Sequence, residues 1–521
     1  MDFLSFIISA EGLGVVASLL VSVAVAYLIL KKYKPQTALF FGGITLFMLV
    51  IIINSIFGEA AQIIGNPHLP PAHTLNKLKT LGNPFLDIFA SIEGLFSNRV
   101  AGLGLLIMTV MGFVKYMDAI GANKMLVHIG VKPLRFVKSP YFVLMLAFLI
   151  GQTMKIAITS AAGLGVLLMA TMFPILMRLG VSRLAATAVI ATTGCIDLGP
   201  ASGTGIAIVE AANILTSDGK ADMATFFIKY QLPVAIPIII VVELLHFVTQ
   251  YWFDKKDGYV IKNSICHTAP DAEIPCQARN DKRETDKIED LNVPTFYALL
   301  PLIPLFLVLI FNEMVVLQIN NLLEYFGANF IIPIKTIGLV TAILISVFIT
   351  MIIEFFRSLN MKKVFESIQT VFDGMGVAFA SVITLIVAGE VFAAGLLTTG
   401  SINTLLAFAK EQGAGVVPIT LFMQGLIAVA SILMGSGDAA IFSFLSVGNV
   451  VASHFGVEPI SVLMPMQITS SLARSFSPIT AVVVAVSAIA GVSPVEVIKR
   501  TAIPMIGGII ILTIMNVILF M

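Results

Sequence analysis

The amino-acid sequence predicts an all-α polytopic membrane protein with about ten transmembrane helices and two re-entrant helical hairpins in inverted repeats. The prediction depends on composition, on a series of long apolar segments, and on the unusual lengths of four of them. Hydrophobic residues make up 58% of the 521 residues and charged residues only 12%. Because a soluble domain carries about 25% charged residues, most of this surface must face lipid.

Long apolar segments alternate with short charged ones along the whole chain. The N-terminus lacks the positive charge of a cleavable signal peptide, so the first apolar segment, which ends at Lys31, is predicted to be a retained span. Lys plus Arg is 31 and Asp plus Glu is 30, so the net charge indicates no nucleic-acid partner. The apolar segments are 13–30, 36–57, 100–118, 140–177, 184–214, 225–253, 294–311, 334–356, 374–398, 416–452, 459–490 and 501–521.

The distribution of Lys and Arg predicts which loops are cytoplasmic. If the N-terminus is placed in the periplasm, most of the 31 Lys and Arg residues fall in the predicted cytoplasmic loops. The C-terminus is then periplasmic as well. This assignment holds only if segments 140–177 and 416–452 each return to the side from which they enter.

These two segments are therefore predicted to be re-entrant hairpins. Each has a small, polar middle: Thr159-Ser160 in the first, and Ser436-Gly437-Asp438 in the second. With a turn removed, each arm of the first has about 17 residues, the lower limit for crossing a bilayer. We expect both tips near the midplane, the first entering from the cytoplasm and the second from outside.

Two further segments, 184–214 and 459–490, exceed the roughly 20 residues that a span needs. Each has a proline near its middle, Pro200 and Pro478. Proline removes a backbone donor and clashes with the preceding turn, so both helices should break there. Broken backbone at membrane depth is tolerated only where it is buried in protein or lines a water-filled cavity, which predicts a cavity at these breaks.

The same order of elements occurs twice: a span, a hairpin, a broken span and a closing span. The charge distribution orients the two copies oppositely, as in secondary transporters that hold their ligands near the midplane. The predicted parts are N-terminal scaffold helices (1–99), a first inverted repeat (100–253), a cytoplasmic linker (254–293), further scaffold helices (294–373) and a second inverted repeat (374–521).

The hairpin tips and helix breaks are predicted to bind an anionic substrate. Backbone N–H groups at such places lack partners and lie at positive dipole ends, which suits a carboxylate. Two corners related by the repeat suit a ligand with a carboxylate at each end. The alternative is that small residues merely let helices pack closely. The predicted substrate-binding residues are Thr159, Ser160, Pro200, Ser202, Thr204, Ser436, Gly437, Arg474, Ser477 and Thr480.

Four charged residues near these places allow more than one interpretation. Arg474 could hold a substrate carboxylate with its planar guanidinium, or it could pair with Asp197 or Asp438. Those two aspartates could bind Na⁺ or take up a proton as a coupling site, or they could pair structurally with Arg474 or Lys155. Lys155 could likewise hold a substrate carboxylate or be a charge partner of an aspartate, or it could extend toward the cytoplasmic interface.

Residues 257–292 are polar and are predicted to form a flexible cytoplasmic linker. Cys266, His267 and Cys276 do not have the spacing of a metal site. We therefore predict no metal and no cofactor, apart from Na⁺ or H⁺ as a possible coupling ion.

Three motifs resemble the anaerobic C4-dicarboxylate transporters of the DcuC family: GCIDLGPASGTGIA (194–207), MGSGDAAIFSF (434–444) and MPMQITSSLARSFSPITAVVVAVSAIAGVSP (464–494). The resemblance covers most of the chain outside 257–292. It implies succinate, fumarate or malate as substrates, carried across the bacterial inner membrane by exchange, efflux or cation-coupled symport.

That family is similar to the wider Ion Transporter superfamily, whose dicarboxylate members are homodimers with a scaffold and an elevator-type transport domain. In those relatives, Ser-Asn-Thr motifs at both hairpin tips bind substrate carboxylates and sodium. The matching tips here are Thr159-Ser160-Ala161 and Ser436-Gly437-Asp438. Because the Asn is missing, protons or exchange stand beside sodium as alternatives for coupling.

Other functions fit the sequence less well. A carrier for another small anion, or a cation/proton antiporter that uses Asp197 and Asp438, is the closest alternative. An intramembrane enzyme is not supported, since the sequence shows no paired catalytic Asp, metal-spaced His or Ser–Lys dyad. A channel has less reason for inverted symmetry.

Overall fold

The computed structural model describes residues 9–58, 62–69, 74–137, 139–216, 219, 221–258, 293–312, 315–320 and 335–521. Apart from an isolated bridge between Leu215 and Ala221, the regular structure in these ranges is helical. Nine helices within them are long and apolar enough to cross a membrane. The predicted all-α polytopic class is confirmed. The linker residues Cys266, His267 and Cys276 lie outside the described residues.

Helices in the first half begin where a side chain or a proline can end the preceding loop. Ser9, Asn83, Ser182 and Ser202 each accept a hydrogen bond from a backbone N–H of the first turn. The elements are α2 (Ala10–Leu30), α3 (Pro35–Ile56), η1 (Thr74–Lys77), α4 (Pro84–Arg99), η2 (Val100–Gly104), α5 (Leu105–Ala119), α6 (Ala122–Gly130), η3 (Lys132–Phe136), α7 (Pro140–Met154), α8 (Ala161–Thr171), α9 (Phe173–Arg178), α10 (Arg183–Thr192), α11 (Gly203–Ala211), α12 (Met223–Thr225), η4 (Phe226–Gln231) and α13 (Leu232–Lys256).

The second half also contains a long helix with a π-helical turn, a helical hairpin and an interrupted helix. Its elements are η5 (Thr295–Leu302), α15 (Ile303–Ile310), α17 (Leu339–Ser358), α18 (Met361–Ala378), η6 (Phe379–Ile383), α19 (Thr384–Thr398), α20 (Ser401–Glu411), α21 (Val416–Met434), α22 (Gly437–Phe455), α23 (Pro459–Arg474), α24 (Ala481–Ala490) and α25 (Pro494–Phe520).

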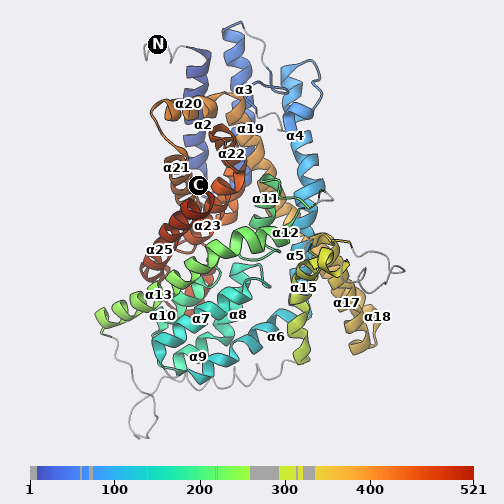
Figure 1. Ribbon diagram of the computed structural model, residues 1–521, viewed down its shortest axis with the longest axis vertical. Coiled ribbons are helices and arrows are strands. Elements are labelled where there is room, and N and C mark those ends of the chain that lie inside the picture. The colour runs from blue at the N-terminus through green and yellow to red at the C-terminus, as the bar shows by residue number, and fades with distance from the viewer. Residues whose placement is uncertain are drawn as a thin grey trace, which may run out of the picture.

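Two very long helices run through the molecule in opposite directions. In Figure 1, α4 lies above α5, whereas α18 lies below α19. The first run, Pro84–Ala119, has 36 residues, and the second, Met361–Thr398, has 38. Each contains a π-helical turn, η2 or η6. The predicted divisions at 99/100 and 373/374 therefore fall inside continuous helices, because the polar residues that suggested the end of an apolar span are accommodated within the helical runs.

The two predicted hairpin segments form helical hairpins that approach from opposite ends of the molecule. Hairpin 1 (α7 to α9) lies in the lower part of Figure 1, and hairpin 2 (α21 and α22) lies in the upper part. Their arms are unequal: α7 has 15 residues and α8 has 11, while α21 and α22 have 19 each. The arms of hairpin 2 are thus long enough to count among the nine candidate spans.

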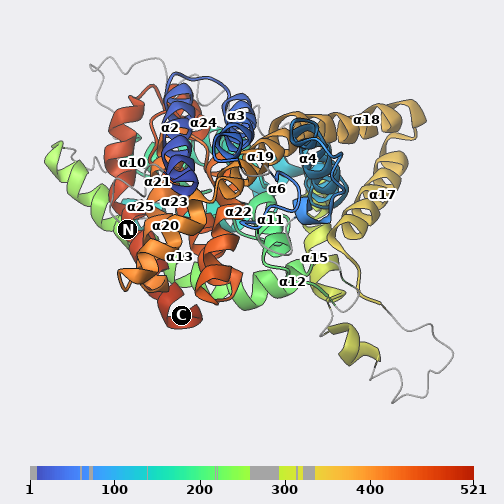
Figure 2. The same ribbon diagram turned by 90° about the horizontal axis from the view of Figure 1, so that it is seen from above.

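The long helices and the closing helices occupy different sides of the molecule. Figure 2 shows α17 and α18 to one side and α13 and α25 to the other, with α11, α22 and α23 between them. Helices α5 and α18 cross in close contact, since a Cβ atom at Gly374 would lie 2.7 Å from the Cα of Gly112. Helices α13 and α25 are joined by a buried ion pair between Asp254 and Arg500 at 2.6 Å.

Candidate functional site

A cavity of about 320 Å³ lies where both hairpin tips meet both interrupted helices. Hairpin 1 contributes Thr159 and Ser160, and hairpin 2 contributes Ser436 and Asp438. The opposite wall is apolar and comes from the long helices. It consists of Ile107, Val110 and Met111 of α5 and Val382 of η6. The polar groups of the cavity therefore all come from the hairpins and breaks, which also contribute apolar residues such as Phe442 and Val482, whereas the side of the long helices is apolar.

Several helices begin at this cavity, because small polar side chains end the preceding segments. Ser160 accepts a hydrogen bond from the Gly163 N–H at 3.1 Å and starts α8. Ser436 accepts one from the Ala439 N–H at 3.2 Å and starts α22. Helix α11 begins after Ser202, and α24 begins after Thr480. Converging N-termini produce positive potential, which favours an anion.

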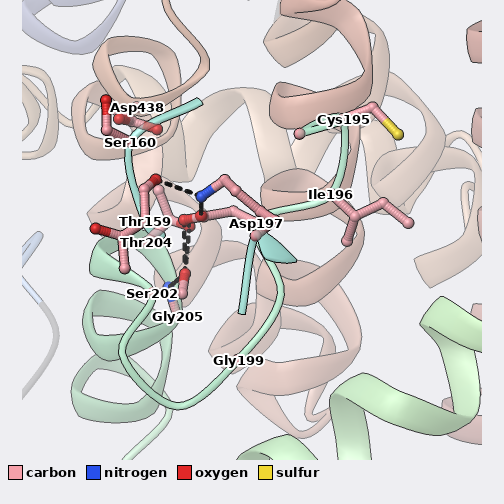
Figure 3. A network of polar contacts seen from close by, with 12 residues as sticks. Thr159, Ser160, Cys195, Ile196, Asp197, Gly199, Ser202, Thr204, Gly205 and Asp438 are labelled. Atoms are coloured by element: carbon pink, nitrogen blue, oxygen red, sulfur yellow. Dashed lines mark hydrogen bonds and ion pairs between the residues drawn. The ribbon is translucent and has the colours of Figure 1, made fainter. Parts of the chain in front are cut away.

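The first break holds a closed ion pair, drawn in Figure 3. Lys155 Nζ lies 2.5 Å from Asp197 Oδ1, and it also donates to the carbonyl oxygen of Thr159. Ser202 and Thr204 donate their hydroxyl groups to Asp197 Oδ2 at 2.6 and 2.7 Å. Lys155 is only 1% exposed. The alternative in which Lys155 extends to the interface is wrong, because its ammonium group is held inside the protein.

The second break holds a more open pair. Arg474 Nη1 lies 3.7 Å from Asp438 Oδ1, which is an ion pair but too long for a hydrogen bond. The Asp438 side chain is 47% exposed, whereas that of Arg474 is 12% exposed. Arg474 Nη2 also donates to the carbonyl oxygen of Gly194 at 3.2 Å. Arg474 thus links the second break to the first and reaches the cavity wall.

The structure brings together most of the predicted residues. Those that line the cavity are Thr159, Ser160, Thr204, Ser436, Arg474 and Thr480, together with Asp197 and Asp438.

Four predicted residues, and Lys155, do not line the cavity. Ser202 is buried behind Asp197. Ser477 donates its hydroxyl group to the Ile432 carbonyl at 2.7 Å and so ties the break to hairpin 2. Gly437 packs against the backbone of Ser470. Pro200 borders a separate small apolar pocket beside Pro301 and Pro304. These residues do not face the cavity but support the segments that line it.

Sequence reasoning assigned no role to Gln467, which donates its amide to Thr204 Oγ1 at 3.0 Å and so connects α23 to α11. It lies seven positions before Arg474 on the same helix, so helical spacing was the available signal. Arg99 and Glu390 are likewise not among the residues that the sequence predicted for the site. The structure pairs these two side chains between α4 and α19.

The fixed charges around the cavity are balanced. Lys155 and Arg474 supply two positive charges, and Asp197 and Asp438 supply two negative ones. The described charged groups at the cavity therefore sum to no net charge. Across the described ranges, no group of three or more His, Cys, Asp or Glu side chains could hold a metal ion.

Two solved transporter structures share this fold. The chain matches the Alcanivorax borkumensis YdaH transporter with a TM-score of 0.54 and 14% identity, over 91% of this chain and 98% of that one. It matches Neisseria gonorrhoeae MtrF, from a class of antimetabolite efflux pumps, with a TM-score of 0.55 and 13% identity, over 91% and 94%. At these identities the likeness shows the fold alone.

Sequence comparison identifies much closer relatives. The family model of DcuC, the C4-dicarboxylate anaerobic carrier, matches residues 13–521. The anaerobic C4-dicarboxylate transporter DcuC of Escherichia coli K12 is 35% identical over 492 residues, 94% of this chain and 93% of that one. The probable DcuC of Vibrio cholerae is 33% identical over 501 residues, 96% of each chain. The chain therefore belongs to the DcuC family of anaerobic C4-dicarboxylate carriers, and it is a membrane transporter rather than an enzyme.

Proposed function

We propose that this protein carries C4-dicarboxylates such as succinate, fumarate and malate across the bacterial inner membrane, by exchange, efflux or cation-coupled symport. The observation that carries the proposal is the central cavity, in which helix N-termini and Arg474 surround a space of about 320 Å³. The relatives named as C4-dicarboxylate transporters support this substrate class.

A dicarboxylate would place one carboxylate at each side of this cavity. One end would lie near Arg474, Ser436 and Thr480, where α22 and α24 begin. The other end would lie near Thr159 and Ser160, where α8 begins. Hydroxyl groups and backbone N–H groups at both ends would replace the water lost by the carboxylates.

The charge balance of the site favours entry of a cation with the substrate. A dianion added to a neutral, partly buried site leaves two uncompensated negative charges, which is costly in a low dielectric. Protonation of Asp438, or a Na⁺ ion beside it, would offset part of that cost. Asp438 is the better candidate of the two aspartates, because Asp197 is fully engaged by Lys155.

We further propose an elevator-type movement. Hairpins 1 and 2, the interrupted helices and the closing helices would move as a transport domain against a scaffold of α2 to α5, α15 and α17 to α19. The apolar wall that the long helices present to the cavity suits a surface along which a polar site slides. The inverted order of the two halves supports this mechanism, with periplasmic termini and a homodimeric scaffold.

Counterflow into proteoliposomes tests the function. Liposomes loaded with succinate should accumulate labelled external succinate, and Na⁺ and pH gradients should be varied separately. Stimulation by an inward proton gradient alone would support coupling at Asp438, whereas stimulation by Na⁺ alone would assign that role to sodium. Absence of dicarboxylate counterflow from protein that is folded and inserted would contradict the proposal.

A cation/proton antiporter is the second candidate, because Asp438 faces the cavity and is half-exposed. In that case a pH gradient should drive cation flux in liposomes that contain no dicarboxylate.

A further inference from the structure

A triad of charged residues away from the central cavity joins three helices. Arg99, at the end of α4, donates through Nε to Glu390 Oε1 of α19 at 2.6 Å, and its Nη2 contacts the same oxygen. Its Nη1 lies 3.7 Å from Oε2 of Glu210, which belongs to α11. The side chains of Arg99 and Glu390 are 17% and 9% exposed, and that of Glu210 is 31% exposed. Arg99 is thus shared between two carboxylates.

The two carboxylates hold Arg99 very differently. Glu390 makes hydrogen bonds to it, whereas Glu210 lies beyond hydrogen-bond distance. Glu210 Oε2 is buried and has no hydrogen-bond partner among the described residues. Glu210 approaches the π-helical turn closely, because Gly102 of η2 has no side chain to obstruct its carboxylate. Arg99 is therefore anchored at Glu390 and offers its remaining charge to Glu210.

The triad connects the proposed scaffold to the proposed transport domain. Helices α4 and α19 pack against each other and belong to the proposed scaffold. Helix α11 is the second part of an interrupted helix, and Asn449 of hairpin 2 donates to the Ala211 carbonyl at its end. A movement of the hairpins past the long helices would separate Glu210 from Arg99 but would leave the Arg99–Glu390 pair intact.

Among the described residues, this contact forms at only one of the two π-helical turns. Arg99 immediately precedes η2, and the matching position before η6 is occupied by Ala378. Two inverted halves favour two transport states of similar energy. A charged contact that forms at only one of the two π-helical turns would make the energies of the two transport states unequal.

We propose that Arg99 is a positioning residue that favours the transport state seen here, by holding α11 through Glu210 while Glu390 anchors it to the scaffold. The inference rests on the elevator movement proposed above. Because Arg99 is shared, the two carboxylates compete for it. Loss of the Glu390 charge should strengthen the contact with Glu210, and loss of the Glu210 charge should abolish it.

Glu210→Gln and Glu390→Gln should consequently shift the equilibrium in opposite directions. Spin labels at Ser97 on α4 and Ser453 on α22, both exposed, would report the distance between the proposed scaffold and transport domain in liposomes. The labelled protein would carry Cys195, Cys266 and Cys276 as Ala, and would be measured with and without succinate. We expect Glu210→Gln to lower the population at the main wild-type distance about fivefold relative to the population at the alternative distance. Glu390→Gln should raise the same ratio by a similar factor.

The possible outcomes distinguish the proposed role of Arg99 from the elevator movement on which it rests. Succinate could change the ratio of two distance populations while neither variant changes it. That result would overturn the proposed role of Arg99 but would still support the elevator movement. Shifts of both variants in the same direction would also overturn that role, because they indicate general loosening. A single distance under every condition would overturn both proposals. Glu411→Gln, an exposed carboxylate on α20, is the matched control and should change nothing.

Discussion

Each interrupted helix forms a charge pair with a neighbouring hairpin, and the two pairs are in very different states. At the first break, Lys155 and Asp197 are buried, lie 2.5 Å apart and share further hydrogen bonds with Ser202 and Thr204. At the second break, Arg474 and Asp438 are 3.7 Å apart, and Asp438 is half-exposed to the cavity. Halves with the same order of elements have thus produced one closed pair and one open pair.

The difference indicates a division of roles. A buried ion pair that is fully hydrogen-bonded has little capacity to accept a new partner, and removal of one member leaves an uncompensated charge. An open pair can exchange its partner for a ligand at modest cost. The first break should therefore hold the site together, and the second should respond to substrate and to a coupling ion. Five variants test this contrast.

Lys155→Met should produce the largest effect, on stability. It leaves the Asp197 carboxylate buried without its cation, which costs about 3–5 kcal/mol of unfolding free energy. Thermal unfolding of the purified protein in detergent would measure the loss. The double variant Lys155→Met/Asp197→Asn should recover most of it, because no charge is then buried alone. Wild-type stability in the single variant would contradict a structural role for this pair.

Arg474→Ala should abolish transport with little loss of stability. The guanidinium can make two charged hydrogen bonds to a carboxylate, each contributing about 1.5–3 kcal/mol, so we expect succinate counterflow to fall at least ~100-fold. Arg474→Lys should recover only part of the rate, because an ammonium group lacks the planar fork. Lys410→Ala, an exposed position on α20, serves as the control. Wild-type rates in Arg474→Ala would refute the assigned role.

Asp438→Asn should remove the pH dependence of transport. If a proton enters with the dianion, the wild-type rate rises as pH falls, since protonated Asp438 no longer repels a carboxylate. The charged groups around Asp438 are Arg474, Asp197 and Lys155. The neutral Asn should hold the rate near its low-pH level at every pH, with about a tenfold difference from wild type at high pH. A pH profile that keeps its wild-type shape would assign coupling elsewhere.

Thr159→Val and Thr480→Val form a matched pair with the smallest effects. Thr159 Oγ1 is buried and has no partner among the described residues, so its loss should raise the KM for succinate about threefold to fivefold without affecting stability. Thr480 Oγ1 donates to the Arg474 carbonyl at 2.6 Å, so its loss should cost about 1 kcal/mol of stability. If the two variants had equal effects on KM and on the free energy of unfolding, Thr159 and Thr480 would not differ in role as proposed.

The fold class was predictable because its signals are local. Apolar length defines spans, and the structure has nine such helices among its described residues. Ser160, Ser202 and Ser436 each start a helix through a hydrogen bond within a few positions, which sequence can indicate. The sequence did not predict that helices continue across the boundaries at 99/100 and 373/374, because a charged or polar residue within a long helix resembles the end of a span when its partner is unknown.

The candidate site was predictable in its members but not in its pairings. Thr159, Asp197, Ser436 and Arg474 were selected from hairpin tips and breaks, and the structure places all four around one cavity. The sequence did not determine which aspartate pairs with which basic side chain, and it allowed more than one role for both Arg474 and Lys155. Their roles in binding remain predictions that the variants above examine.

By itself, the sequence determined that this chain is a helical membrane protein, that it contains two helical hairpins with small polar tips, and that it interrupts two of its helices. These properties depend on hydrophobicity, proline and helix-starting residues within about 20 positions of each other. Only the tertiary structure decided the charge partners. Lys155 and Asp197 are 42 positions apart, and Arg99 and Glu390 are 291 apart. Coulomb energy depends on distance and burial in space, so helix packing had to be known before these pairs could be assigned.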